Sequence, residues 1–181
     1  MKLYLLLIIF FLHLKTGHSQ VSLYTKTVDS LVNVINRSSL QAIPDSSFYS
    51  NKIGADGRVE TKQKYYLLYD DSLALRKVTW KLATTVTMGA DTVKEEMANI
   101  FYYAKDKLLK IEGSSKSKKE PGIFQLYFSN DKMVRAIPPV NEEKGNPDGI
   151  IFFAKNLITI FNAKKSNLKP ATTPPPSPSS L

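Results

Sequence analysis

The side chains that could do chemistry in this chain are carboxylates, hydroxyls and lysines. The sequence has no cysteine, and its only two histidines are His13 and His18. Both precede Gln20, in a segment with the pattern of a secretory signal: Lys2, an unbroken apolar run, and small residues before a cut after Ser19. We therefore expect the exported chain to lack imidazole and thiol groups, which serine–histidine triads, cysteine nucleophiles and common zinc sites require.

Two pairs of carboxylates could supply a general acid and base, as in glycoside hydrolases. Glu95 and Glu96 are neighbours on a predicted strand, so their side chains should point to opposite faces. Glu60 and Glu112 would meet only if the tertiary structure brought them together. A Ser–Lys pair within residues 114–118 is a further option, but the composition of this stretch indicates a loop, which supports catalytic groups poorly. We predict that the protein is not an enzyme and uses no cofactor and no metal, with a carboxylate hydrolase as a lesser alternative.

The charge of the chain is basic. Its formal net charge of +9 falls to +7 once Lys2 and Lys15 leave with the signal. Lys116, Lys118 and Lys119 crowd one predicted loop and form a candidate basic patch. Such a patch can contact acidic glycans or anionic lipid headgroups, although lysines that keep a sheet soluble and guard its edges are the simpler explanation. The sequence has no nucleic-acid-binding motif, so we expect no nucleic acid partner.

The aromatic residues offer a candidate binding surface, because they gather near the ends of predicted hairpins. Rings on an exposed sheet face stack on sugars or anchor a protein partner. Tyrosine is also an ordinary half-buried strand residue, so the same rings could belong to the core. The candidate binding residues are Tyr66, Tyr69, Trp80, Tyr102 and Tyr127.

The elements that must position these residues are mostly strands. From about residue 48 to residue 137, segments of alternating apolar and polar residues are separated by turns, as in an antiparallel meander. The clearest strand is 78–88, in which Val78, Trp80 and Val86 share one face. Residues 101–111 also align with residues 126–136, and residues 67–78 form a looser copy. Because the spacing between copies varies, we predict stacked hairpins rather than a solenoid.

A helix is predicted on each side of this meander. The first carries an apolar stripe at spacings of three and four residues. The second begins at Asn146-Pro147, which are favourable at a helix start, and is so apolar over residues 150–161 that it should pack across one face of the sheet. The stripe residues of the first helix are Tyr24, Val28, Leu31 and Ile35.

Together these elements predict an α+β fold: an antiparallel β-meander of about six or seven strands with an N-terminal helix and an apolar C-terminal helix. We expect a signal peptide at 1–19, a single globular domain at 20–168, and a disordered tail at 169–181 that is rich in Pro, Ser and Thr. The pattern predicts no transmembrane segment after signal cleavage.

Several segments resemble small uncharacterised periplasmic proteins of Bacteroidota. The resemblance rests on the leader ending at Ser19-Gln20, on the helix end Ile35-Asn36, and on Tyr102-Tyr103 and Tyr127-Phe128 with their Asp-Lys turns. It implies the fold and a secreted or periplasmic location, and it implies no activity.

We therefore expect a non-catalytic binding or envelope-associated protein that uses an exposed sheet face for a protein, a glycan or an amphiphile. The alternative is a periplasmic carrier of apolar ligands, with the C-terminal helix as a lid over a curved sheet. The space beneath this helix distinguishes the two, because a cavity favours the carrier and a filled core favours the binder.

Overall fold

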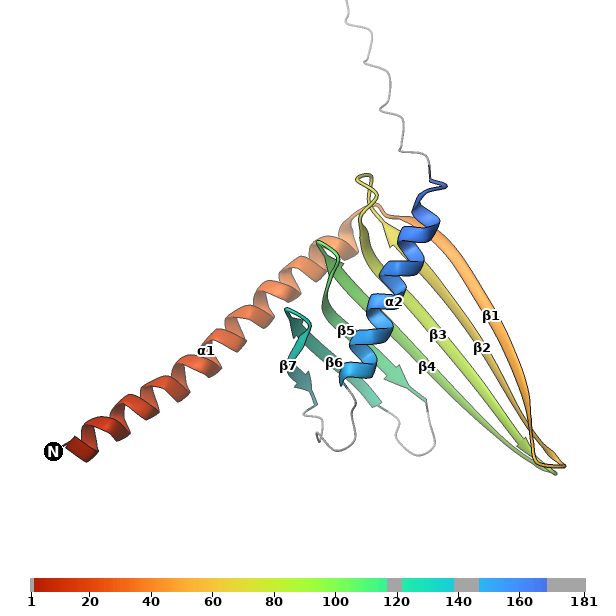
Figure 1. Cartoon of the computed structure of the whole chain (residues 1–181), viewed down its shortest axis with the longest axis horizontal. Helices are drawn as coiled ribbons and strands as arrows, with labels where there is room; N and C mark the ends of the chain where they lie inside the picture. Colours follow the sequence, from red (N-terminus) through yellow and green to blue (C-terminus); the bar gives the residue numbers. More distant parts are fainter. Residues whose placement is uncertain (1, 117–121, 139–146, 169–181) are drawn as a thin grey trace, which may run out of the picture.

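The computed structural model describes residues 2–116, 122–138 and 147–168, with the backbone alone for residues 2–19 and 147. One sheet of seven antiparallel strands, paired in chain order, lies between two helices, so the predicted α+β meander is confirmed (Figure 1). The elements are α1 (Lys2–Arg37), β1 (Gln41–Ile53), β2 (Gly57–Tyr69), β3 (Leu75–Met88), β4 (Asp91–Ala104), β5 (Lys107–Ser115), β6 (Gly122–Ser129), β7 (Lys132–Ile137) and α2 (Pro147–Lys165).

The two helices pack against opposite faces of the sheet. In β4, Phe101 and Tyr103 belong to the apolar cluster that α2 covers, whereas Tyr102 between them belongs to the cluster beneath α1. Successive side chains of a strand point to opposite faces, so the molecule has three layers. We name the two sides of the sheet the α1 face and the α2 face. In Figure 1, α2 lies across the near face and α1 extends away to the left.

The α2 face holds the larger part of the core. Ala154, Leu157 and Phe161 on α2 are each 1% exposed. The ring of Phe161 lies 5.7 Å from that of Tyr69, and Phe153 packs between the rings of two sheet residues. The helix begins at Pro147, where its missing N–H costs nothing because the first turn has no intrahelical acceptor for it.

The contact between α1 and the sheet differs in one residue from the predicted stripe. Val28, Val32 and Ile35 are buried, whereas Leu31 is 43% exposed. Helical spacing allows either Leu31 or Val32 beside Val28, and the position of the sheet selects Val32. The hydroxyl of Tyr24 donates a hydrogen bond to the backbone carbonyl of Phe128 on β6. Of the helical segments that the structure describes, none combines the length and hydropathy needed to span a bilayer.

The internal repeat of the sequence corresponds to the hairpins β2–β3, β4–β5 and β6–β7. In each hairpin the strand register shifts beside an aromatic residue. The turns of the last two hairpins have consecutive residues with positive φ, at Lys105-Asp106 and at Asn130-Asp131, as type I′ turns require. The register shifts lie at Leu68/Tyr69, Tyr102/Tyr103 and Tyr127/Phe128.

The sheet starts earlier than predicted, at Gln41 rather than near residue 48. Pro44 and Asp45 are unfavourable strand residues, so the local sequence does not indicate a strand here. Antiparallel pairing with the C-terminal half of β2 holds this segment in the sheet. The resulting long strands β1–β4 extend well beyond α2, to the lower right of Figure 1.

Candidate functional site

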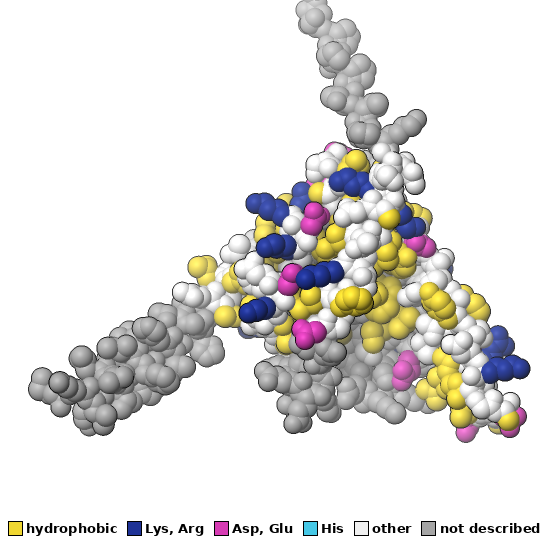
Figure 2. Space-filling view, viewed as in Figure 1, with side chains coloured by type: hydrophobic (Ala, Val, Ile, Leu, Met, Phe, Trp, Pro, Cys, Tyr) yellow, Lys and Arg dark blue, Asp and Glu magenta, His cyan; other side chains and the backbone are white. Residues whose placement is uncertain are grey.

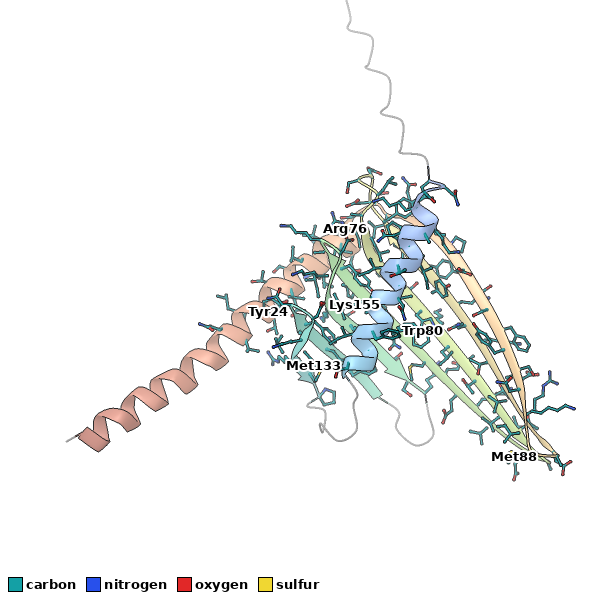
Figure 3. All side chains as sticks on the ribbon, viewed as in Figure 1. Tyr24, Arg76, Trp80, Met88, Met133 and Lys155 are labelled. Carbon is teal, nitrogen blue, oxygen red and sulfur yellow. The ribbon has the colours of Figure 1, made fainter. Side chains whose placement is uncertain are left out.

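The five aromatic residues predicted to form a binding surface do not share one exposed face. Tyr69, Tyr102 and Tyr127 are buried, with exposed fractions of 5%, 1% and 2%. Trp80 is half-buried on the α2 face, where Figure 3 shows it beside α2. Tyr66 is the one of the five that is exposed, at 44%. The expected exposed aromatic face is therefore absent from these residues, because the repeated hairpins turn most of their rings toward the two helices.

Two of the buried rings belong to a polar row of the sheet beneath α1. In this row basic side chains alternate with tyrosines, because β3, β5 and β7 each contribute a base and β4 and β6 each contribute a ring. The row consists of Lys77, Tyr102, Lys110, Tyr127 and Arg135.

Each base of the polar row bonds to a polar residue of α1. The three helix residues lie at spacings of four and seven, so they form one stripe on α1. This match between a helix stripe and a strand row sets how α1 lies on the sheet. The pairs, given as donor and acceptor, are Lys77 with Asn36 at 2.8 Å, Lys110 with Asp29 at 2.7 Å and Arg135 with Thr25 at 3.3 Å.

Lys110 is the centre of this row, and its side chain is only 5% exposed. Its Nζ lies 2.7 Å from Asp29 and 2.9 Å from Glu112, and 4.9 Å from the ring centre of Tyr127. Burial by itself lowers the pKa of Lys110, but the bonds to both carboxylates outweigh it and raise that pKa above the usual 10.5. Lys110 is therefore a fixed cation that anchors α1, and a charged lysine of this kind is a poor nucleophile or base.

The carboxylate pairs considered as acid and base are not brought together. Glu95 and Glu96 lie opposite different residues of β3 and point to opposite faces, as predicted. Glu60 on β2 forms an ion pair with Arg58 at 2.9 Å, and β3 and β4 separate it from Glu112 on β5. Within the described ranges, no three residues of the types His, Cys, Asp and Glu gather where they could hold a metal ion.

A groove of about 400 Å³ lies on the α1 face, and one row of side chains separates it from the polar row. We call it the basic groove, because four lysines and one glutamate line it. Its floor consists of small side chains: Ala98 lies opposite Ser114 on β5, and Ala83 lies one row away on β3. On a flat sheet, short side chains beside long ones create a hollow. The charged lining residues are Lys62, Lys64, Lys81, Glu96 and Lys116.

The lysines of the basic groove are poorly neutralised. Lys64 and Lys81 lie directly opposite each other in the β2–β3 register. Like charges in such a pair destabilise a sheet, and in the described part of the chain neither lysine forms a salt bridge. Lys62 lies 5.7 Å above the ring of Phe48, and this contact provides no full counter-charge.

Of the basic patch predicted from the sequence, Lys116 lines this groove. Its Nζ lies 3.6 Å from Glu96. Lys118 and Lys119 lie outside the described residues. The loop expected at residues 114–118 is wrong for its first two residues, because β5 continues to Ser115 through its pairing with β4.

The lysines of β2 and β3 were not identified from the sequence as a site. Lys62 and Lys64 alternate with other residues on β2, as Lys77 and Lys81 do on β3, which indicated only a solvent-exposed strand face. Which lysine meets which depends on the strand register, and no local pattern contains the register. The alternation of lysines was therefore visible in the sequence, but it did not show which lysines would be neighbours in the sheet.

The opposite face of the long strands has a different character. Beyond α2 it carries the apolar side chains of Met88, Val93 and Met97, which are 53%, 41% and 37% exposed. Figure 2 shows apolar side chains around α2 and below it, and Figure 3 places Met88 at the far end of β3. The two faces therefore offer different surfaces, one apolar and one basic.

The geometry of the basic groove suits the binding of an anion, because four lysines and one glutamate line it. Its volume falls within the range of small-ligand sites, about 300–1,000 Å³. Comparison of the chain with protein-family models, with curated proteins and with solved structures finds no match in any of the three. The function is therefore argued from this geometry alone.

Proposed function

We propose that this protein is a non-catalytic binding module whose site is the basic groove, and that the site takes an anionic group. The observation that carries the proposal is the opposed pair Lys64 and Lys81 above a floor of small side chains. Their mutual repulsion costs stability. A bound phosphate, sulfate or carboxylate would remove this cost, and such an anion would meet several ammonium groups at once.

The surroundings of the groove support a ligand larger than a bare ion. Ile123 on β6 lies opposite Ser114 of the floor and is 78% exposed. Phe48 and Tyr66 are 52% and 44% exposed, and Tyr66 lines a neighbouring hollow together with Lys64. Aromatic and aliphatic side chains beside cations suit a sugar ring or the apolar part of an amphiphile. We infer an anionic glycan or an anionic amphiphile as the ligand class.

The carrier alternative receives less support. A carrier needs a cavity beneath α2, whereas Ala154, Leu157 and Phe161 fill that interface at 1% exposure each. Among the described residues, the space that would hold an apolar ligand is occupied by the protein's own side chains. A filled core beneath α2 therefore favours a surface binder over a carrier.

We also propose that the protein works after export, in the periplasm or outside the cell, without residues 1–19. The described side-chain contacts between α1 and the sheet come from Tyr24 and later residues, so cleavage after Ser19 would leave these contacts in place. These contacts support the proposal that the protein works without residues 1–19.

Replacement of both opposed lysines tests the groove. The double variant Lys64→Gln, Lys81→Gln should bind dextran sulfate, or vesicles containing phosphatidylglycerol, at least about tenfold more weakly, which is about 1.4 kcal/mol. Its free energy of unfolding should stay equal or rise, because a repulsive pair is removed. Binding by the unmodified chain should also weaken as salt is added. The measurement is titration by isothermal calorimetry or vesicle co-sedimentation.

The matched control removes the same charge elsewhere. Lys26 on α1 and Lys132 on β7 are exposed and lie outside the groove, so the variant Lys26→Gln, Lys132→Gln should keep full affinity. Equal weakening in both double variants would mean that net charge alone attracts the probe, and it would refute the groove. Vesicles of phosphatidylcholine alone should not bind either protein.

A further inference from the structure

β1 forms one edge of the sheet, and the central part of this edge lacks the residues that usually protect one. In the described part of the chain β1 pairs with β2 alone, over 13 residues without a register shift. Natural edge strands are commonly short, charged or interrupted by proline or a bulge, which prevents pairing with another chain. From Ser46 to Asn51, β1 has no charged residue, no glycine and no proline.

The opposite edge follows the usual protective pattern. β7 has only six residues, carries Lys132 and Arg135, and lies in contact with α1. The contrast between the two edges is the observation from which the inference starts. One edge is built against pairing, and the other is long and neutral at its centre.

Pro44 shows which backbone groups of β1 face outward. A proline within a sheet has no N–H to donate, so its nitrogen faces away from the neighbouring strand. Because the direction alternates along an antiparallel strand, the N–H and C=O groups of Ser46, Phe48 and Ser50 face outward as well. The N–H of Ser46 is donated to Oδ1 of Asp45 at 2.7 Å, whereas those of Phe48 and Ser50 point toward the open edge.

We propose that two copies of the chain associate through antiparallel pairing of their β1 strands about a two-fold axis at Phe48. In this register Phe48 lies opposite Phe48 of the second copy, and Ser46 lies opposite Ser50. On the other face, Ser47 lies opposite Tyr49. At each end Asp45 faces Asn51 of the second copy, whose amide can donate to the carboxylate.

The register is self-complementary, which is why the second copy is the occupant. A two-fold interface uses the same patch of both copies, so each residue pair occurs twice, once on each side of the axis. The pair of Asp45 and Asn51 does not place like charges opposite each other. The central pair joins two copies of Phe48, whose side chain is 52% exposed in the single chain. The exposed Tyr49, at 55%, gains a neighbour on the other face.

The pairing has a consequence for binding. The two-fold axis is perpendicular to the sheet, so both α1 faces point the same way and the two basic grooves lie on one side of the dimer. Lys62, which lies opposite Phe48 within each copy, flanks the central pair from both sides. A dimer thus presents two anion sites to one surface, and a repetitive or membrane-bound ligand would be held by both.

Cysteine cross-linking tests this register, because the chain has no cysteine of its own. In the proposed pair, the Cα atoms of residue 48 and its copy should be about 5.5 Å apart, which a disulfide can bridge. Phe48→Cys should form a disulfide-linked dimer under mild oxidation. Tyr49→Cys is the control, since its copy would lie diagonally, about 7–8 Å away, and should cross-link far less. Equal cross-linking of the two variants overturns the register.

Sedimentation equilibrium tests the association itself. The unmodified chain should change from monomer to dimer as its concentration rises, and a chain that stays monomeric at every concentration overturns the proposal.

Ser50→Pro should be monomeric at concentrations where the unmodified chain is a dimer, because it removes an outward N–H without touching the β1–β2 ladder. A circular dichroism spectrum equal to that of the unmodified chain shows that the fold is kept. Ser50→Pro retains all groove lysines, so its affinity for a single soluble anion tests the groove separately.

Discussion

Lys110 and Lys64 show how cross-strand neighbours decide what a lysine does. Both lie on the α1 face of the sheet, on β2 and on β5. Lys110 lies between two tyrosines and reaches two carboxylates, so its charge is satisfied within the fold. Lys64 lies opposite Lys81, and its charge is left for solvent or a ligand. The first holds the protein together, and the second is available for binding.

Asp70 is a second residue whose role follows from its bonds. It holds the turn between β2 and β3 by accepting hydrogen bonds from the backbone N–H of Ser72 at 3.0 Å and of Ala74 at 3.1 Å, and from Nε of Arg76 at 2.6 Å. Partial burial alone raises the pKa of Asp70, but the bonds from the hydroxyl of Ser72, from Arg76 and from the backbone of Ala74 outweigh it and lower that pKa below 3.8. The charged carboxylate therefore stabilises the folded state.

The pH dependence of stability tests this role. A carboxylate with a lowered folded pKa stabilises at pH values above its unfolded pKa, and the contribution is lost as the pH falls through the folded pKa. Asp70→Asn should reduce the free energy of unfolding by about 1 kcal/mol at neutral pH. In the unmodified chain the free energy of unfolding should fall further as the pH drops below about 4, and Asp70→Asn should make this further fall smaller. Urea denaturation across this range measures both effects.

The neighbouring Asp71 provides the control, because it is exposed. Asp71→Asn should shift the free energy of unfolding by no more than about 0.5 kcal/mol. Its acid dependence should match that of the unmodified chain. If the free energy of unfolding depends on pH in the same way in both variants and in the unmodified chain, the charged Asp70 carboxylate does not stabilise the fold as described.

At the scale of elements, α2 shows how one helix closes a whole face of the sheet. Its start at Pro147 and its apolar stripe were both predicted from local sequence, and the stripe residues Ala154, Leu157 and Phe161 are buried. The other helix was predicted less well, since Val32 rather than Leu31 meets the sheet. A wide apolar stripe tolerates rotation of the helix, whereas the narrower one on α1 requires the partner surface to set the angle.

Two phenylalanines of α2 provide a matched test of this packing. Phe161 is 1% exposed and Phe152 is 68% exposed. Phe161→Ala should lower the free energy of unfolding by about 4 kcal/mol, because it removes a ring from the filled core and leaves a cavity. Phe152→Ala should change it by no more than about 0.5 kcal/mol. Chemical denaturation measures both, and similar losses would contradict the packing of α2.

At the scale of the whole molecule, the sheet separates two surfaces with different chemistry. The α2 face joins a filled core to exposed apolar side chains on the long strands, and the α1 face joins the helix contact to the basic groove. The described contacts that hold α1 come from residues C-terminal to Ser19.

The first residue of the exported protein tests the proposed processing. N-terminal sequencing of the protein purified from the medium or the periplasm should begin at Gln20. A recombinant chain that begins at Gln20 should have the same free energy of unfolding as the full chain, within about 0.5 kcal/mol. An exported protein that begins at Met1 would contradict the proposal, and it would also return His13 and His18 to the working molecule.

Local sequence was sufficient for most elements of this protein. The meander and the repeated hairpins follow from period-two alternation and from turn residues, which act within a few positions along the chain. Residues such as Pro44 carry the opposite local signal, and there the strand exists only because β2 pairs with it.

The tertiary structure alone decided where the functional surfaces lie. The local sequence around Tyr102 and Tyr127 does not distinguish them from an exposed tyrosine. They are buried because α1 packs over their row. Lys64 and Lys81 are 17 residues apart in the β2–β3 hairpin, and only the strand register places them face to face. A sequence records which side chains share a strand face, but register and helix docking depend on the summed contacts of distant segments. Those contacts determine which charges are neutralised and which stay open to a ligand.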